Sequence, residues 1–209
     1  MNLIIFGPPG AGKGTQAKRV AKELDLTHVS TGDIFRDNIK KQTPLGKEVS
    51  ELISKGNLVS DHITNELVKD RLTQKDVKNG FLLDGYPRTV SQANFLDILP
   101  GKIDKVINLQ VPDEELIKRI AARRICSNCK AEFNLIYNKP KKEGVCDNCH
   151  GELIQRKDDN EESVKNRLAV YHKDTQPVIK FYENKGIVIN IDGFQPIEKV
   201  TSNILGMLE

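Results

Sequence analysis

The sequence lacks the features of membrane, secreted and fibrous proteins. Its apolar runs are short, such as the four residues of Leu3–Phe6, whereas a membrane-spanning helix needs about 20 apolar residues. The N-terminus does not have the charged start and longer apolar segment of a secretory signal. With 15 glycines and 9 prolines in 209 residues, collagen-like and low-complexity classes are excluded. We therefore expect a cytoplasmic protein without a membrane partner.

Excess charge of one sign and aromatic residues are also scarce. The chain has 32 Lys and Arg against 29 Asp and Glu, and 5% aromatic residues. Nucleic-acid binders typically carry a basic stripe with interleaved aromatic residues, so no nucleic-acid partner is expected. The 38% apolar and 29% charged residues are typical of a globular protein, and the length fits one domain with insertions.

Five short apolar runs alternate with segments of helical periodicity. The runs are 2–6, 27–30, 80–84, 105–110 and 186–192, and the helical segments include 15–24, 61–72, 90–99, 113–122 and 161–184. Because the runs are continuous rather than alternating, both faces of each strand are expected to be covered. The pattern predicts an α/β fold with an open, five-stranded parallel sheet flanked by helices.

Two stretches interrupt this alternation. Residues 31–59 favour two short helices, and residues 123–159 are polar, rich in turns and contain all four cysteines. We interpret both as insertions at the edge of the sheet, where loops carry function. The predicted organisation is a core of residues 1–29, 60–122 and 160–209, a helical insertion of residues 30–59 and a second insertion of residues 123–159.

The strongest motif is GPPGAGKGT at residues 7–15, between an apolar run and a helical segment. Glycines let the backbone wrap a phosphate with its N–H groups pointing inward, and the helix start adds partial positive charge. Lys13 adds a full charge for the outer phosphates. The usual phosphate loop has Ser or Thr after the lysine to bind Mg²⁺, whereas here Gly14 stands there and Thr15 follows.

A carboxylate is predicted beside this loop. Asp84 ends the apolar run of residues 81–83, and the carboxyl ends of parallel strands meet at one edge of a sheet. Asp84 is therefore a candidate for holding Mg²⁺, directly or through water. A turn or helix-capping aspartate is the alternative interpretation.

Three motifs together resemble the adenylate kinase family: GPPGAGKGT at 7–15, STGD at 30–33 and DGYPR at 84–88. The resemblance extends from Met1 to about Gln195. It implies a phosphate-loop NTPase-like core, an AMP-binding unit at residues 30–59 and a lid at residues 123–159. The implied activity is Mg²⁺-dependent transfer of a phosphoryl group from ATP to AMP, giving two ADP, in a monomeric enzyme.

The resemblance also assigns contacts. The catalytic residues that it implies are Lys13, Asp84, Arg88, Arg123, Arg156 and Arg167. The implied ATP contacts are Gly10, Ala11, Gly12, Lys13, Gly14, Thr15, Arg119, Arg123, Glu132, Phe133 and Gln195. The implied AMP contacts are Thr31, Arg36, Asn57, Leu58, Val59, Gly85, Tyr86, Pro87, Arg88, Gln92, Arg156 and Arg167.

Some of these residues have more than one interpretation. Thr31 and Gln92 match the positions that read the adenine edge, although Gln92 also completes a capping-box pattern with Thr89. Arg119 and Arg123 are four residues apart and are expected to share one helix face. The resemblance makes the carboxylates at 158–159 hinge residues of the lid, whereas their position before a helical segment equally favours capping.

The four cysteines form two CxxC pairs, Cys126 with Cys129 and Cys146 with Cys149, separated by 16 residues. This spacing is typical of a Cys₄ zinc site. Four thiolates leave no open position on the metal, so the expected Zn²⁺ is structural. The segment has few large apolar residues, among them Tyr137, and metal binding would supply folding energy that burial cannot.

Two other functions remain open from the sequence. One is a kinase for UMP, CMP or GMP, which an assay across the monophosphates would distinguish. The other is a zinc-ribbon nucleic-acid binder regulated by ATP, which three lysines between residues 139 and 142 leave conceivable. Steeply salt-dependent binding of DNA or RNA would favour it.

Overall fold

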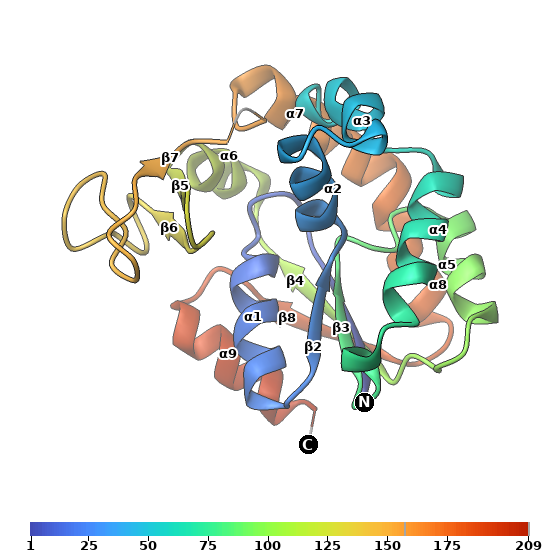
Figure 1. The fold of residues 1–209 in the computed structure, drawn as a ribbon. Coiled ribbons are helices and arrows are strands. Elements are labelled where there is room, and N and C mark those ends of the chain that lie inside the picture. The colour runs from blue at the N-terminus through green and yellow to red at the C-terminus, as the bar shows by residue number, and fades with distance from the viewer. Residues whose placement is uncertain (157, 209) are drawn as a thin grey trace.

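The computed structural model describes residues 1–156 and 158–208. Its central sheet has five parallel strands in the order β2-β3-β1-β4-β8 (Figure 1). The strands are β1 (Asn2–Phe6), β2 (Thr27–Ser30), β3 (Phe81–Asp84), β4 (Lys105–Gln110) and β8 (Val188–Asp192). The predicted α/β fold and five-stranded parallel sheet are therefore confirmed, and each predicted strand lies within two residues of its observed bounds.

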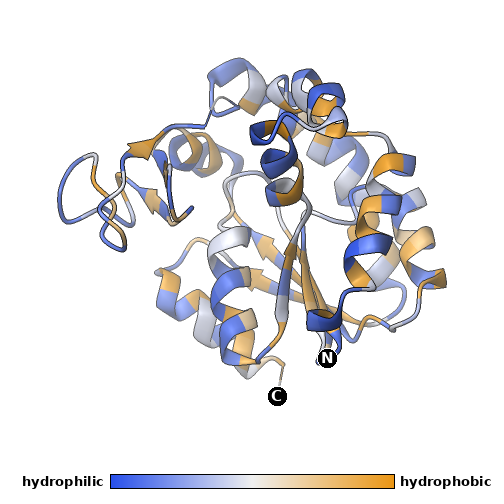
Figure 2. Ribbon diagram, viewed as in Figure 1, coloured by the Kyte–Doolittle hydropathy of each residue, from blue (hydrophilic) through white to orange (hydrophobic). Residues whose placement is uncertain are grey.

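Helices cover both faces of the sheet because successive residues of β1 point to opposite sides. Leu3 and Ile5 pack toward α1 (Lys13–Glu23), α6 (Asp113–Ala121), α7 (Glu161–Val170) and α9 (Ile197–Gly206). Ile4 and Phe6 pack toward α4 (Asp61–Leu72), α5 (Val90–Ile98) and α8 (Gln176–Glu183). Figure 2 shows the apolar strands between helices whose outer faces are polar. The two apolar layers fix the sheet, and with it the loops at its carboxyl edge.

The strand register brings three loops together at this edge. Asp84, at the end of β3, is level with Ser30 of β2 and Ile5 of β1. The chain leaves these strands into the phosphate loop, into α2 (Thr31–Lys40) and into the segment that precedes α5. The three motifs of the sequence are thus neighbours in space.

The helical insertion contains α2 and α3 (Pro44–Ser54), with an apolar cluster of its own built around Phe35, Val49 and Val59. Gly46 allows α3 to lie directly against the backbone of α2, because a Cβ there would come 2.1 Å from the carbonyl oxygen of Asn38. No other residue fits at this contact, so the sequence Pro-Leu-Gly fixes how the two helices pack.

The second insertion, β5 (Arg123–Cys126), β6 (Glu132–Asn134) and β7 (Leu153–Ile154), forms an antiparallel sheet with β5 in the centre. It stands apart from the core in Figure 1. Its apolar cluster consists of Cys126, Phe133, Cys146 and Leu153. Residues 157 and 209, which fall in the predicted lid and core ranges, lie outside the described residues.

The helical segment predicted at 161–184 is not one regular helix. It consists of α7, a π-helical turn at Tyr171–Thr175 and α8. Pro177 lies in the first turn of α8 and has no N–H to donate, so the backbone pattern changes just before it. The Thr175 hydroxyl in this turn donates to the carbonyl oxygen of Arg88, at 3.1 Å.

Among the described residues, no helix has the length and apolar character needed to cross a membrane.

Candidate active site and cysteine cluster

The phosphate loop joins β1 to α1 and leaves the start of the helix open. The residue before the helix, Gly12, has φ +94° and offers no side-chain cap to the first N–H groups. Gly7 and Gly10 also have positive φ, and a Cβ on either would lie 2.9 Å from a neighbouring atom. Glycine is therefore required by both conformation and space. The free N–H groups of the first turn are suited to bind an anion.

Lys13 opens α1 with its ammonium group directed back over the loop. Its Nζ donates to the carbonyl oxygens of Gly7, at 2.7 Å, and Pro8, at 2.9 Å. Burial lowers the pKa of Lys13 to about 7, and the charges of Arg88 and Arg167 act in the same direction against the opposing charge of Asp84. A bound polyphosphate would place a negatively charged partner beside this ammonium group, in addition to the two carbonyl oxygens.

Asp84 lies at the carboxyl edge of the sheet with Lys13 and His28. Burial raises its pKa, but His28 and the charge of Lys13 outweigh burial and hold the pKa below its usual value. His28 Nε2 is 3.5 Å from Asp84 Oδ2. A Cβ on Gly14 would lie 3.6 Å from the same carboxylate oxygen, so Asp84 faces the start of α1. An ionised carboxylate at this point fits Mg²⁺, which prefers oxygen ligands.

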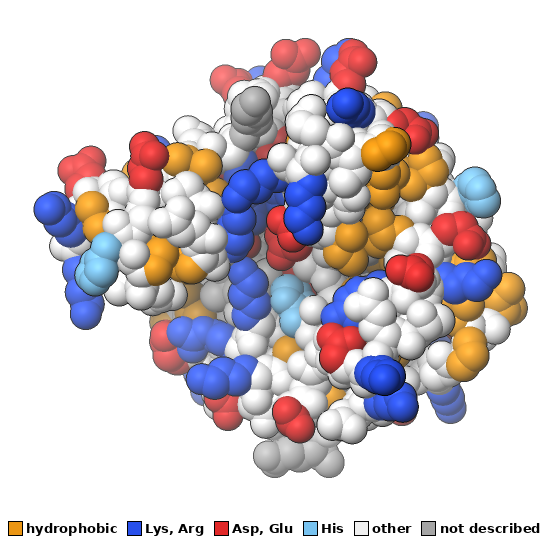
Figure 3. Space-filling view, in the orientation of Figure 1, with side chains coloured by type: hydrophobic (Ala, Val, Ile, Leu, Met, Phe, Trp, Pro, Cys, Tyr) orange, Lys and Arg blue, Asp and Glu red, His pale blue; other side chains and the backbone are white. Residues whose placement is uncertain are grey.

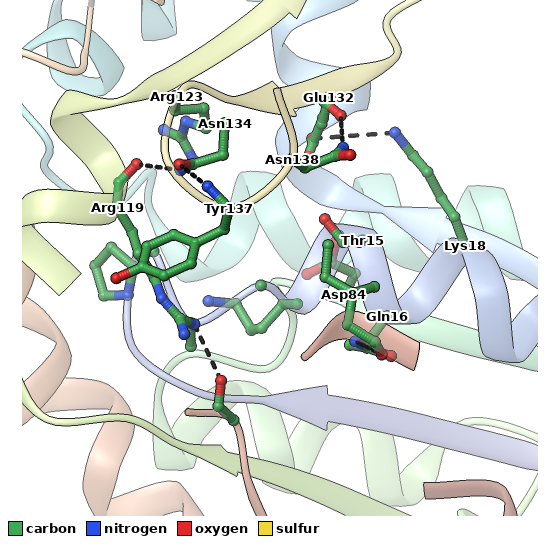
Figure 4. Close-up of a pocket in the computed structure, with 18 of the residues that line it drawn as sticks. Thr15, Gln16, Lys18, Asp84, Arg119, Arg123, Glu132, Asn134, Tyr137 and Asn138 are labelled. Atoms are coloured by element: carbon green, nitrogen blue, oxygen red, sulfur yellow. Dashed lines mark hydrogen bonds and ion pairs between the residues drawn. The ribbon is translucent and has the colours of Figure 1, made fainter. Parts of the chain in front are cut away.

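A cleft of about 600 Å³ opens above these groups. It is lined by the phosphate loop, the start of α2, the segment after β3, strands β5 and β6 and the loop before α9. Figure 4 shows residues from these elements around it, and Figure 3 shows Lys and Arg side chains gathered along the hollow. The described lining includes Arg36, Arg88, Arg119, Arg123, Arg156 and Arg167, which are all the arginines singled out in the sequence.

Carboxylates pair with most of these guanidinium groups. Arg123 donates to both oxygens of Asp159, and Arg167 lies 3.1 Å from Asp158 and 3.5 Å from Asp159. The other pairs are Arg36 with Asp33 at 2.7 Å, Arg156 with Glu132 at 2.8 Å and Arg119 with Glu115 at 3.2 Å. Burial and the charge of Arg123 lower the pKa of Arg167 to about 10. The cleft therefore holds strongly crowded positive charge.

We expect Asp159→Asn to destabilise the protein by about 3–5 kcal/mol, because it removes the ionised partner that two largely buried guanidinium groups share. The Asp159 side chain has no exposed surface, and that of Arg123 is 16% exposed. Denaturant unfolding would measure the change, with Asp37→Asn on the exposed face of α2 as the matched control. Equal stability of the two variants would contradict this assignment.

In this region the structure corrects one expectation and decides against one of two open interpretations. Arg119 and Arg123 do not share a helix face, because α6 ends at Ala121 and Arg123 begins β5. Asp158 and Asp159 do not cap α7: Asn160 does, by accepting from the N–H of Ser163. Helix α6 ends one residue earlier than the predicted segment of residues 113–122.

Tyr137 and Phe194 are site residues that the sequence did not reveal. Tyr137 is 48% exposed and lines the cleft. Arg119 lies over its ring at 5.2 Å and over the ring of Phe194 at 5.7 Å, and it donates to the carbonyl oxygen of Gly193. Two half-exposed aromatic rings beside one guanidinium group form a surface on which a nucleobase can stack. The sequence feature that could have identified them is an aromatic residue within an otherwise polar loop.

The predicted ATP contacts lie together. The described lining contains all of them: Gly10, Ala11, Gly12, Lys13, Gly14, Thr15, Arg119, Arg123, Glu132, Phe133 and Gln195. Figure 4 shows Arg119 beside Tyr137, and Thr15 and Asp84 at another part of the same cleft. The same cleft thus offers an anion site and a base site.

The predicted AMP contacts divide into two groups. Arg36, Gly85, Arg88, Arg156 and Arg167 line the cleft. Thr31, Asn57, Leu58, Val59, Tyr86, Pro87 and Gln92 are not among the described residues that line it. Thr31 is 2% exposed and donates to the carbonyl oxygen of Gly85, while Gln92 is 1% exposed and accepts from the N–H of Arg88. The expected base-reading pair therefore lies directly behind the segment of residues 85–88.

The four cysteines lie together in the second insertion, residues 123–159. Their Sγ atoms are all within 4.8 Å of one another, with 3.4 Å between Cys126 and Cys149 and 3.5 Å between Cys129 and Cys146. Zn–S bonds of about 2.3 Å in a tetrahedron place the sulfurs about 3.8 Å apart. Burial raises the pKa of Cys126, but backbone N–H groups outweigh burial and lower it. The cluster could bind zinc, as its spacing predicts.

The parallel sheet, the glycine-rich loop and the cationic cleft define a phosphate-loop nucleotide-binding protein. Comparison with known proteins narrows this class. The profile of the family described as adenylate kinase matches residues 5–187. A protein named adenylate kinase from Caldicellulosiruptor bescii is 54% identical over 212 residues, which cover 100% of this chain and 99% of the relative.

Two further relatives carry the same name. The adenylate kinase of Desulforamulus reducens is 54% identical over 209 residues, covering 98% of each chain. That of Staphylococcus aureus is 48% identical over 213 residues, covering 100% of this chain and 99% of the relative. The chain belongs to the adenylate kinase family, and it is therefore a nucleotide-binding transferase.

Proposed function

We propose that this protein catalyses the reversible, Mg²⁺-dependent transfer of a phosphoryl group from ATP to AMP, giving two ADP. The observation that carries the proposal is the convergence of Lys13 and six arginines on one cleft beside Asp84. A site that brings two polyphosphates together must neutralise their repulsion. Family membership over the whole chain supports the same reaction.

The reaction needs no dedicated general base. A phosphate monoester has a second pKa of about 6 and is mostly ionised at pH 7, so AMP itself is the nucleophile. Catalysis then consists of positioning and charge stabilisation. We assign these roles at the transferring phosphate to Lys13, Arg88, Arg123, Arg156 and Arg167.

On the ATP side, residues 10–15 would hold the phosphates and Arg119 would face the base. Tyr137 and Phe194 would add the stacking surface described above. Glu132 and Gln195, the latter in the loop between β8 and α9, would contact ATP beside it. A bound Mg²⁺ would neutralise charge on the phosphates, and Asp84 would hold it directly or through water. Because Gly14 has no side chain, nothing of this residue stands between Asp84 and the phosphate loop. This supports a role for Asp84 in holding Mg²⁺, in place of the Ser or Thr hydroxyl that usually follows the lysine.

On the AMP side, residues 30–59 would form the binding unit. Arg36 and Arg88 would bind the AMP phosphate, while the buried pair Thr31 and Gln92 would read the base. The backbone of residues 57–59 would lie against the nucleotide. Direct hydrogen bonds of Thr31 and Gln92 to residues 85–88 support this, because they connect base recognition to the arginine at the point of transfer.

Residues 123–159 would act as a lid stabilised by zinc. Arg123 begins β5, Glu132 begins β6 and Arg156 follows β7, so closing of this small sheet would move three charged groups together. Closure would exclude water, which competes with AMP for the phosphoryl group.

The test is ADP formation from MgATP and AMP by the purified protein. We expect two ADP for each AMP consumed, no reaction with EDTA in excess over Mg²⁺, and turnover of UMP, CMP and GMP at least about tenfold slower. The Lys13→Ala protein, purified in the same way, controls for contaminating kinases. Folded protein that forms no ADP from AMP would overturn the proposal, and faster turnover of another monophosphate would reassign the acceptor.

A further inference from the structure

The side chain of Gln92 is held at both ends of its amide group. Its Oε1 accepts from the N–H of Arg88 at 2.7 Å, and its Nε2 donates to Oδ1 of Asp61 at 2.8 Å. The capping box expected from the sequence is thus only half formed: the Thr89 hydroxyl accepts from the N–H of Gln92, but the Gln92 side chain bonds elsewhere. Something other than helix capping determines where this amide points.

Asp61 is the residue that selects the orientation. It lies in the first turn of α4, which packs beside α5 (Figure 1). Its Oδ2 accepts from the Thr89 hydroxyl at 2.9 Å while Oδ1 accepts from Gln92. The charge of Asp61 also contributes, after burial, to raising the pKa of Tyr86, whose hydroxyl donates to the carbonyl oxygen of Gln92 at 3.2 Å. Asp61 therefore contacts both the Gln92 amide and the Thr89 hydroxyl that caps the same helix.

An ionised carboxylate accepts hydrogen bonds but cannot donate them, and a backbone N–H can only donate. If the Gln92 amide were turned over, its oxygen would face the Asp61 carboxylate and its NH₂ group would face the Arg88 N–H. Both contacts would be repulsive, and both groups would lose a partner in a buried place. Asp61 and Arg88 together thus allow one of the two amide orientations.

The orientation matters because purine bases differ at position 6. Adenine carries an amino group there, which donates, whereas hypoxanthine and guanine carry an oxygen, which accepts. In the fixed orientation, Gln92 has one lone pair on Oε1 and one N–H on Nε2 beyond the bonds described, since the amide has two of each. A turned amide would present the opposite pattern and would suit a 6-oxopurine.

We propose that Asp61 is a positioning residue that sets the preference of the acceptor site for a 6-aminopurine over a 6-oxopurine monophosphate, by fixing the amide of Gln92. The inference rests on the proposed function, because it concerns how the AMP site of that reaction selects its base. Asp61 acts through Gln92 and has no assigned contact with the nucleotide.

The test compares AMP and IMP as phosphoryl acceptors in the wild type and in Asp61→Asn. An asparagine amide can donate to Gln92 as well as accept from it, so the penalty on the turned orientation falls. We expect the ratio of kcat/KM for IMP to kcat/KM for AMP to rise by about tenfold, with a higher KM for AMP and nearly unchanged kcat. Asp70→Asn, on the exposed surface of the same helix, is the matched control and should leave the ratio unchanged.

A structural role alone would lower activity with both nucleotides and leave the ratio constant, and that result would overturn the proposal. Asp61→Ser, in which water can replace the carboxylate, provides a second variant and is expected to raise the ratio in the same direction. Wild-type protein that does not phosphorylate AMP would instead refute the proposed function. The two failures are therefore distinguishable.

Discussion

Replacing Lys13 by alanine is expected to lower kcat/KM for ADP formation by on the order of 10³-fold, the effect of losing a preorganised cation at a transferring phosphate. The ammonium group is held over the loop by two carbonyl oxygens, so it is already in place when the nucleotide arrives. Lys22→Ala, on the exposed face of the same helix, is the control and should retain full activity. A loss of less than tenfold in Lys13→Ala would contradict this role.

The same substitution should not destabilise the protein. Burial lowers the pKa of Lys13 from 10.5 to about 7, so below pH 7 the folded state carries a charge that it disfavours. This penalty is full below pH 7 and declines as the pH rises toward 10.5, because the folded state then loses the proton while the unfolded state keeps it. Lys13→Ala should therefore melt at a higher temperature than the wild type at pH 6, and the difference should shrink at pH 9. A lower melting temperature at pH 6 would contradict the assignment.

The sheet and the phosphate loop were predictable because their signals are local. A continuous apolar run such as 2–6 is buried on both faces whatever follows it, and a glycine-rich loop before a helix is required by backbone conformation. Asp84 could be placed beside the loop because parallel strands bring their carboxyl ends to one edge. The six arginines could be named only through the family resemblance, because charge alone does not indicate whether a side chain points into a cleft or toward solvent.

The partners of those arginines could not be predicted. Asp159 contacts Arg123, 36 residues away, and Asp61 contacts Gln92, 31 residues away. Both contacts form only when distant elements of the chain pack together.

The small antiparallel sheet of residues 123–154 could not be predicted for a related reason. Its strands have two to four residues, which is too few to show a periodicity.

Removing zinc is the second change with a large expected effect. We expect about one Zn²⁺ per chain in protein purified under reducing conditions, and its loss should unfold the lid before the core. The lid has four residues in its apolar cluster, two of them cysteines, and a sheet this small is not stable alone. Zinc binding contributes about 10–16 kcal/mol to the folding of zinc-finger peptides, so the metal would be the main source of lid stability.

Hydrogen exchange can separate the two regions. After chelation, or in Cys129→Ser/Cys149→Ser, amides of β5 and β6 should lose protection by at least about 10³-fold, whereas those of β1 and β4 should keep it. These two cysteines are exposed and the other two are buried, so the double variant removes ligands while leaving the small apolar cluster in place. Asn148→Ser, between the ligands, should keep its zinc. Unchanged lid protection in metal-free protein would show that zinc is not needed.

The activity of the metal-free protein tests the lid itself. Arg123, Glu132 and Arg156 would lose their fixed positions, so transfer to AMP should fall by more than about tenfold. Hydrolysis of ATP should fall less, because an open cleft admits water. The ratio of hydrolysis to transfer should therefore rise and should return to its original value when Zn²⁺ is added back. A constant ratio would mean that these lid residues do not exclude water, and the phosphoryl group would then be protected by the core alone.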